Sequence, residues 1–401
     1  MMFRVNRLAT GLMLMGCAPF ASAAGFALIE QNVSGLGNAY AGQAAAATDA
    51  STIFFNPAGM TLLPDRQVVM AGHLIKPQTE FAGTATPNNG GGQGGDAGDP
   101  ALVPNGYFAF RLTPDVHLGI GMSAPFGLKT EYDSGWIGSN HAVKSELKTI
   151  NLNPSIAWKA SPSLSLGAGL SLQYVKATLT NTSPAGLATV KGDDYGWGFN
   201  LGALWQINPA TRIGLAYRSE VEYTLEGTVA FSGVPVLNGP VTADATMPDS
   251  ASLSLFHKVN TRWDLLADVT WTGWSDFDEL RIVRTTGAVV GVTPENWRDT
   301  WRYSVGANYH YSNTLTLRGG VAFDQRAASD EFRTARIPDE DRTWLAFGAQ
   351  YRMSERSRID VGYAHLFVKD ARLNKTEGGV SLTGTYEGSV DIVSAQLTVD
   401  F

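Results

Sequence analysis

The side chains that most often bind metals or transfer protons are scattered in this sequence. Its six histidines stand at positions 73, 117, 141, 257, 310 and 365, and no two have the His-x-x-x-His spacing of a metal site. The stretch from Asn88 to Asp99, NNGGGQGGDAGD, contains one Gly-Gly-x-Gly-x-Asp motif of the calcium-binding repeats, which bind calcium only as arrays. We therefore expect no metal site and interpret this stretch as a flexible external loop.

Nucleophilic chemistry has equally little support in the sequence. There is no Gly-x-Ser-x-Gly elbow. Cys17 is the only cysteine, so a single chain can form neither a disulfide nor a cysteine metal site. The net charge of −7, without any cluster of lysines and arginines, argues against a nucleic-acid partner. These observations predict a protein that has no catalytic residues or cofactor and is not an enzyme.

Residues 1–23 have the composition of a signal peptide. Arg4 and Arg7 supply a positive start, 8–20 form a largely apolar core, and Ala21-Ser22-Ala23 supplies small residues before a cleavage site. An alternative is that Leu14-Met15-Gly16-Cys17 marks a lipoprotein, with Cys17 lipidated. Both interpretations predict that the chain is exported.

Alternation of apolar and polar residues is the dominant pattern after Arg66. In one such run, the apolar face consists of Leu164, Leu166, Ala168, Leu170, Leu172 and Tyr174. The pattern recurs at 263–271, 301–311 and 393–401, and the opposite face there includes charged residues such as Asp264, Asp268 and Arg302. A period of two predicts strands, of which one face meets an apolar medium and the other meets water. The runs are long enough to cross a membrane as tilted strands.

The alternating lengths of the turns and loops distinguish a membrane barrel from a soluble β protein. Short breaks fall at 113–115, 161–163, 208–210, 259–261, 312–313 and 353–355. Long polar or glycine-rich stretches alternate with them near 81–103, 129–144, 181–192, 232–242, 287–297, 327–340 and 372–383. Six turns and seven loops in strict alternation predict fourteen antiparallel strands over 65–401. A closed barrel also leaves no exposed strand edges. We therefore expect an all-β transmembrane barrel in the outer membrane of a Gram-negative bacterium, with a secreted soluble β protein as the alternative.

Three further features refine the barrel. Residues 24–64 are rich in Gly, Ala and Asn and lack a sustained apolar period, which predicts a hatch (plug) packed inside the lumen. Pro125 lies in the expected third strand and has no N–H for a ladder, so either this strand kinks and opens the wall, or it ends at Ala124. The alternating last strand ends on Phe401, which resembles the signal by which the barrel-assembly machinery recognises outer-membrane proteins.

Several motifs give the chain a family resemblance over its whole mature length. They are Ala24-Gly25-Phe26, Ser34-Gly35-Leu36-Gly37, Asn56-Pro57-Ala58, Gly196-Trp197-Gly198-Phe199-Asn200, Tyr217-Arg218-Ser219-Glu220-Val221, Trp271-Thr272-x-Trp274-Ser275 and Ile337-Pro338-Asp339-x-Asp341-Arg342. In this order, they resemble the long-chain fatty-acid transporter family of Gram-negative outer membranes (FadL/TodX type). The resemblance implies a fourteen-stranded barrel with an N-terminal hatch. It also implies a hydrophobic ligand that leaves sideways into membrane lipid at a kink in the third strand.

The resemblance also assigns residues to roles. It implies that Phe26 and Leu28 at the start of the hatch contact ligand, that Asn56-Pro57-Ala58 is the hatch motif, and that Arg298 meets a carboxylate. The lateral opening would consist of Ser123, Ala124, Pro125, Phe126 and Gly127. A second arginine of the family is replaced by Asn181, and the loops at 181–192 and 232–242 look short beside those of fatty-acid transporters. Both departures weaken the fatty-acid assignment and are compatible with aromatic or other neutral hydrocarbons as the ligand.

The sequence thus predicts an outer-membrane transporter of hydrophobic small molecules, with long-chain fatty acids as the leading substrate. Monoaromatic hydrocarbons such as toluene are the alternative within the same fold. A general porin, a purely structural barrel and an outer-membrane lipase with Ser and His brought together across strands remain as rivals.

Overall fold

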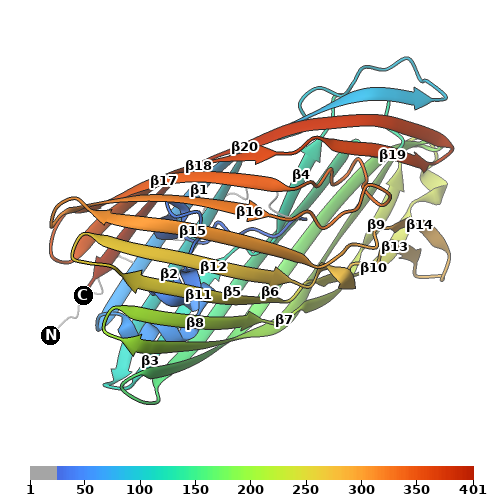
Figure 1. Ribbon diagram of the computed structural model, residues 1–401. Coiled ribbons are helices and arrows are strands. Elements are labelled where there is room, and N and C mark those ends of the chain that lie inside the picture. The colour runs from blue at the N-terminus through green and yellow to red at the C-terminus, as the bar shows by residue number, and fades with distance from the viewer. Residues whose placement is uncertain (1–24) are drawn as a thin grey trace, which may run out of the picture.

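The computed structural model describes residues 25–401, so the expected signal peptide of residues 1–23 and Cys17 lie outside the described residues. The chain forms a closed antiparallel β-barrel of fourteen strands, as predicted (Figure 1). Closure comes from the first strand, β1 (Arg66–Thr86), which pairs with β2 (Ala101–Thr113) on one side and β20 (Val380–Asp400) on the other. None of the helices in residues 25–401 is long and apolar enough to span a membrane.

Six of the fourteen strands are interrupted, so the described residues 25–401 contain twenty strand segments. The other continuous strands are β5 (Lys144–Lys159), β6 (Leu164–Ser183), β7 (Gly186–Asn208), β16 (Leu315–Asp324) and β17 (Arg342–Arg352). The interrupted strands consist of β3 (Val116–Ser123) with β4 (Gly127–Glu131), β8 (Thr211–Arg218) with β9 (Val221–Phe231), β10 (Gly239–Met247) with β11 (Ser250–Lys258), β12 (Trp263–Thr272) with β13 (Glu279–Arg284), β14 (Val289–Pro294) with β15 (Thr300–His310), and β18 (Ser357–Val368) with β19 (Ala371–Glu377).

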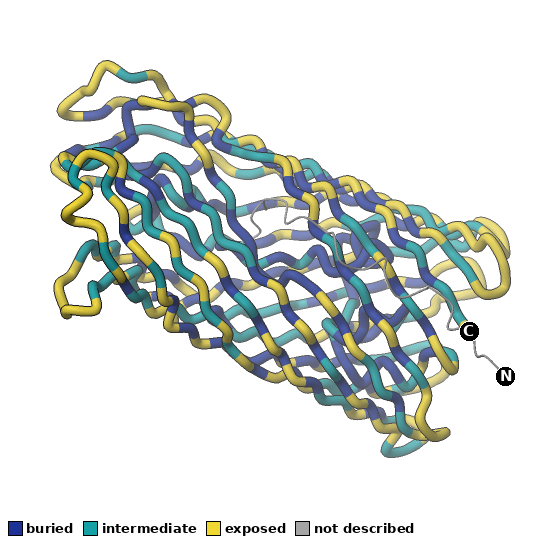
Figure 2. Tube along the Cα trace, turned by 180° about the vertical axis from the view of Figure 1, so that it is seen from behind, coloured by how far each residue is buried: buried dark blue, intermediate teal, exposed yellow. Residues whose placement is uncertain are grey.

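The barrel has its apolar side chains outside and its polar side chains inside. On β5, Ile150, Leu152 and Ile156 are exposed, while Asn151 and Asn153 between them are buried. Figure 2 shows this alternation of exposed and buried positions around the wall. A protein surrounded by water has the reverse arrangement, so the exterior of this barrel is suited to lipid. The alternation predicted from the sequence is confirmed.

The six predicted tight turns are confirmed, but three of the seven predicted long loops are wrong. Hairpins instead close between Ser183 and Gly186, between Arg284 and Val289, and between Glu377 and Val380. The strands continue beyond the membrane, and β7 is 23 residues long, whereas about ten residues suffice to cross. There the outward face of a strand meets water and needs no apolar residues, so the sequence lacks the alternation. The loop expected at 81–103 is likewise shortened to 87–100.

Residues 25–65, which we call the N-terminal segment, lie inside the barrel near the end that carries the tight turns (Figure 1). The segment contains three short helices, α1 (Val33–Leu36), α2 (Gln43–Ala46) and α3 (Thr52–Phe55), and the 3-10 helix η1 (Pro57–Leu62). Its alanines, glycines and serines are almost all buried. Small side chains let the backbone approach the wall closely, which explains a segment with no apolar period.

Inward-facing polar residues of the barrel bind this segment through its backbone. Arg218 of β8 donates to the carbonyl oxygen of Phe54 at 2.9 Å, and Arg302 of β15 donates to that of Ala39 at 2.8 Å. From other parts of the wall, Asn105 of β2 donates to the carbonyl of Glu30 at 2.8 Å. Short helices leave many carbonyl groups without partners, and these donors satisfy them.

Candidate functional site

The third strand is interrupted where the sequence places Pro125. Segment β3 ends at Ser123 and β4 begins at Gly127. Between β2 and β3 the pairing stops at Gly106 and Met122, and β4 pairs as a strand only with β5. The wall between β2 and β4 therefore lacks a strand ladder. Proline cannot donate a backbone hydrogen bond, which is consistent with an interruption at this residue.

The N-terminal segment occupies the free edge at this interruption. The amide of Leu28 donates to the carbonyl of Pro125 at 2.8 Å, and the amide of Gly127 donates to the carbonyl of Phe26 at 2.9 Å. These bonds flank a bridge between Ala27 and Phe126. The first residues of the segment thus replace part of the missing ladder, and their departure would leave this edge unpaired.

Phe26 is buried in a cluster of four aromatic side chains, which we call the Phe26 cage. The distances from its ring centroid to those of the four rings are 6.2 Å for Phe126, 4.8 Å for Trp274, 5.8 Å for Phe277 and 5.7 Å for Trp297. All four are in the range of favourable aromatic pairs. They come from three strand interruptions, at 124–126, 273–278 and 295–299. The interruptions bring into the lumen side chains that a regular strand would hold at the wall.

An apolar cavity lies on the long-loop side of the Phe26 cage, and we call it the outer cavity. It encloses about 900 Å³ of empty space, including its open mouth. Phe26 and Phe277 line it at the cage, and Leu128, Leu225 and Met247 are among its other apolar residues. An apolar cavity with a few polar groups is typical of sites for small hydrophobic ligands.

Arg336 and Glu295 bring ionisable groups into this apolar lining. Arg336, in the loop between β16 and β17, is partly buried and makes only long hydrogen bonds to the opposite wall. Its acceptors, at 3.2–3.4 Å, are the carbonyl oxygens of Lys144 and Thr180 and the side chains of Ser145 and Asn181. Within residues 25–401, no carboxylate lies at salt-bridge distance from its guanidinium group. A cation with weak partners at an apolar cavity is suited to an anionic headgroup.

Glu295 lies in the interruption between β14 and β15, outside the strand segments. It is only 3 % exposed, and its Oε2 accepts a hydrogen bond from the indole Nε1 of Trp297 at 3.1 Å. Burial raises the pKa of its carboxyl group to about 8. At neutral pH this side chain is therefore mainly a neutral acid.

A second, more polar cavity lies on the tight-turn side of the cage, and we call it the inner cavity. Leu28, Pro125 and Phe126 line it next to the interrupted third strand, and Arg302 and Asp268 line it from the opposite wall. Phe26 lines the outer cavity, whereas Phe126 and Trp274 line the inner one. The Phe26 cage thus lies between the two cavities.

The remaining residues singled out in the sequence lie away from the outer cavity. In the Asn56-Pro57-Ala58 motif, Asn56 is buried and donates to the carbonyl of Ala44 at 2.6 Å and, across to β7, to that of Ala203 at 3.0 Å. A Cβ on Gly202 would lie 1.9 Å from the side-chain oxygen of Asn56, so a glycine is required there. The motif fastens the N-terminal segment to the wall.

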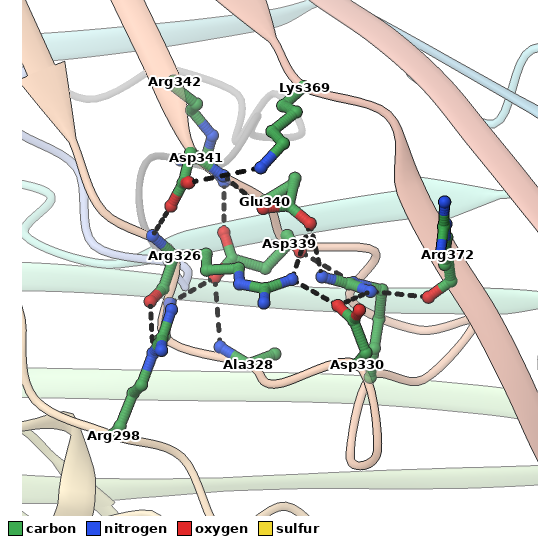
Figure 3. A network of polar contacts seen from close by, with 12 residues as sticks. Arg298, Arg326, Ala328, Asp330, Asp339, Glu340, Asp341, Arg342, Lys369 and Arg372 are labelled. Atoms are coloured by element: carbon green, nitrogen blue, oxygen red, sulfur yellow. Dashed lines mark hydrogen bonds and ion pairs between the residues drawn. The ribbon is translucent and has the colours of Figure 1, made fainter.

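Arg298 is exposed and does not line the outer cavity. Its Nε donates to the carbonyl of Arg326 at 3.4 Å, at the edge of the polar network in Figure 3. The sequence reasoning assigned Phe126 to the lateral opening but gave no role to Arg336, Glu295 or the other cage residues, which are Trp274, Phe277 and Trp297. A signal for them was present, because Arg336 directly precedes the Ile337-Pro338-Asp339 motif and because Glu295 and Trp297 lie within three residues of Arg298. Their convergence depends on the fold.

The network in Figure 3 holds the loop that carries Arg336. Arg333 is fully buried and donates from Nη2 to Glu340 at 2.7 Å and from Nη1 to Asp330 at 2.9 Å. Arg326 also donates to Glu340, at 2.7 Å. Buried charges are tolerated when they are paired in this way, and removal of one partner is costly. The loop between β16 and β17 is therefore an ordered part of the site.

Comparisons with known proteins agree with this architecture. Residues 14–401 match the family model described as outer membrane protein transport protein (OMPP1/FadL/TodX). A long-chain fatty acid transport protein of Escherichia coli O6:H1 is 30 % identical over 409 residues, which cover 91 % of this chain and 92 % of that protein. The structure of a Pseudomonas aeruginosa FadL homologue superimposes with a TM-score of 0.88 at 27 % identity, covering 94 % of this chain and all of that one. The Ralstonia pickettii toluene transporter TbuX shares the fold, with a TM-score of 0.69 at 21 % identity and 92 % and 99 % coverage.

Proposed function

The chain belongs to the outer-membrane transport protein family (OMPP1/FadL/TodX), and from this premise we propose that it imports long-chain fatty acids across the outer membrane. The family consists of transporters of hydrophobic compounds in Gram-negative outer membranes and not of enzymes. The relatives include a fatty-acid transport protein and, at the level of fold, a toluene transporter. The residues that line the outer cavity therefore have to distinguish the two classes of substrate.

The observation that carries the fatty-acid proposal is Arg336 at the outer cavity. A neutral hydrocarbon needs only an apolar cavity. A cation in that cavity would cost desolvation free energy and gain nothing from such a ligand. A fatty acid needs an apolar cavity with one anion-binding group, which this lining supplies. We assign to Arg336 the role that the sequence resemblance gave to Arg298. The guanidinium of Arg336 also lies against Asn181, the position at which the expected second arginine is missing.

The proposed route begins with capture in the outer cavity. A bound chain competes with Phe26 for the cage and displaces the start of the N-terminal segment, which acts as the hatch. Displacement joins the outer and inner cavities and frees the edge of β4 at Ser123–Gly127. The apolar ligand then leaves between β2 and β4 into lipid, because the hydrophobic effect favours lipid over the aqueous periplasm.

Substitution of Arg336 tests the substrate. We expect Arg336→Gln to weaken the binding of laurate to the purified protein roughly tenfold to a hundredfold, the range for losing a hydrogen bond to a charged group. The binding of toluene should be unchanged. Arg298→Gln is the matched control and should leave both affinities as they are. The measurement is a competition assay in detergent at neutral pH.

Other outcomes would assign the protein differently. Toluene binding that is tighter than laurate binding and indifferent to Arg336 would make the chain a monoaromatic-hydrocarbon channel. Absence of binding by both ligands would favour a general porin or a structural barrel. Turnover of an ester substrate would favour the lipase alternative.

A further inference from the structure

Glu295 and Arg336 line the same apolar cavity, yet among the described residues no ion pair joins the carboxyl group to the guanidinium. Groups of opposite charge in such surroundings normally pair directly. Here each is held by a different element. Arg336 is held by the backbone and side chains of β5 and β6, and Glu295 is held by the indole of Trp297. The two polar groups thus line one cavity without pairing with each other.

We propose that Glu295 is a second headgroup contact, a protonated carboxyl group that donates a hydrogen bond to the ligand carboxylate which Arg336 binds. The proposal rests on the fatty-acid function argued above. It adds a specificity residue, because a ligand without an acceptor headgroup gains nothing from this donor. A neutral carboxyl group can donate to a carboxylate, whereas an ionised one would repel it.

The surroundings of Glu295 keep it in the donating form at neutral pH. Burial is the largest effect and raises the pKa of Glu295 to about 8. Glu377 of β19 adds to the rise, whereas the indole N–H of Trp297, Lys375 of β19 and Arg336 oppose it. Above pH 8 the group loses its proton and the headgroup site then contains an additional negative charge.

Glu295 also connects the headgroup site to the Phe26 cage. Its Oε2 accepts from Trp297, and the Trp297 ring is 5.7 Å from that of Phe26 and 4.9 Å from that of Trp274. A ligand that contacts Glu295 therefore acts on a side chain that is already bonded to the cage. Headgroup recognition and the position of Phe26 are linked through one residue.

The pH dependence of laurate binding tests the proposal. The ligand stays ionised throughout the range from pH 6.5 to pH 9, because the pKa of an ordinary carboxyl group is near 4. We expect the wild-type affinity for laurate to fall about tenfold between pH 7 and pH 9, since about one carboxyl in ten remains protonated one unit above its pKa. Dodecanol, with the same chain and no charge, should bind equally at all pH values.

Glu295→Gln is the decisive variant. Glutamine keeps an acceptor for Trp297 and an N–H donor for the ligand but cannot ionise, so laurate affinity should become independent of pH. Laurate affinity that does not change with pH in the wild type would overturn the proposal. So would an affinity that falls equally with pH in the wild type and in Glu295→Gln. The wild-type profile requires no substitution and therefore remains a test even if the variant fails to assemble. Loss of the fatty-acid function would appear differently, as laurate binding that is absent or indifferent to Arg336→Gln.

Discussion

Phe26 can enter its cage only because the residue before it is glycine. Gly25 has a φ of +61°, and a Cβ at this position would lie 2.6 Å from Trp274 and 2.7 Å from Trp297. Left-handed backbone costs other residues about 1–2 kcal/mol, and the two indole rings would also have to move. Gly25 thus lets the two cage tryptophans lie close to the start of the N-terminal segment, which is where the ligand acts in the proposed route.

At the scale of this residue we expect Gly25→Ala to loosen the N-terminal segment and leave the barrel intact. Amide hydrogen exchange over residues 26–32 should become faster, while exchange in the strands stays slow. Gly90→Ala is the matched control, because Gly90 has a φ of +78° but no atom within 4 Å of its would-be Cβ. If residues 26–32 were protected from exchange equally in the wild type and in Gly25→Ala, this would contradict a tightly packed cage.

In the proposed route, the third strand is the element that converts hatch movement into an opening. Regular strands are paired on both edges, so a closed barrel has no exit through its wall. The interruption at 124–126 removes that pairing, and residues 26–28 of the N-terminal segment supply bonds in its place. Ala27 and Phe126 face each other there as a pair without hydrogen bonds between them, the arrangement in which Cα atoms approach most closely.

A reversible crosslink at this pair tests whether the hatch must leave the strand edge. Ala27→Cys with Phe126→Cys places two cysteines at a separation suited to a disulfide, in a chain whose only native cysteine is Cys17. We expect laurate uptake by cells to stop in the oxidised variant and to return after reduction. The reduced protein is its own control for loss of the Phe126 ring. Equal uptake in both redox states would mean that the ligand leaves by another route.

As a whole, the molecule is a barrel whose lumen is filled from the tight-turn end. The N-terminal segment is bonded to strands around the wall, through Asn105 of β2, Arg218 of β8 and Arg302 of β15 among others. Such anchoring leaves no wide aqueous passage through that end, unlike a general porin. Phe401 closes the last strand through a bond from its amide to the carbonyl of Arg66, and its role in assembly stays a prediction.

Ion conductance in planar bilayers tests the filled lumen at this scale. We expect the wild-type protein to conduct far less than an open barrel of the same strand number, because its lumen is occupied by the anchored N-terminal segment. Deletion of residues 25–64 should raise the conductance to that of an open channel. A heat-dependent shift in electrophoretic mobility would show that the deleted variant still forms a barrel. A wild-type conductance as large as that of the variant would point to a general porin.

The sequence by itself determined the barrel, because strand patterns are local. The alternation at 164–174, the six tight turns and the unpatterned stretch after residue 24 were sufficient for fourteen strands with polar residues inside. The same reasoning failed at 181–192, 287–297 and 372–383, since strands in water carry no alternating apolar signal. Pro125 indicated a kink or an end of the third strand, and only the structure shows that β4 continues it.

Only the tertiary structure decided which residues meet at the site. Phe26, Trp274, Glu295 and Arg336 lie in four separate parts of the chain, and three of these are interruptions or loops without a repeating pattern. Their convergence depends on the closure of the barrel, which brings the loop between β16 and β17 across to β5 and β6. Arg298 and Arg336 are both plausible anion ligands by residue type. Their different exposure, which no local pattern encodes, distinguishes them.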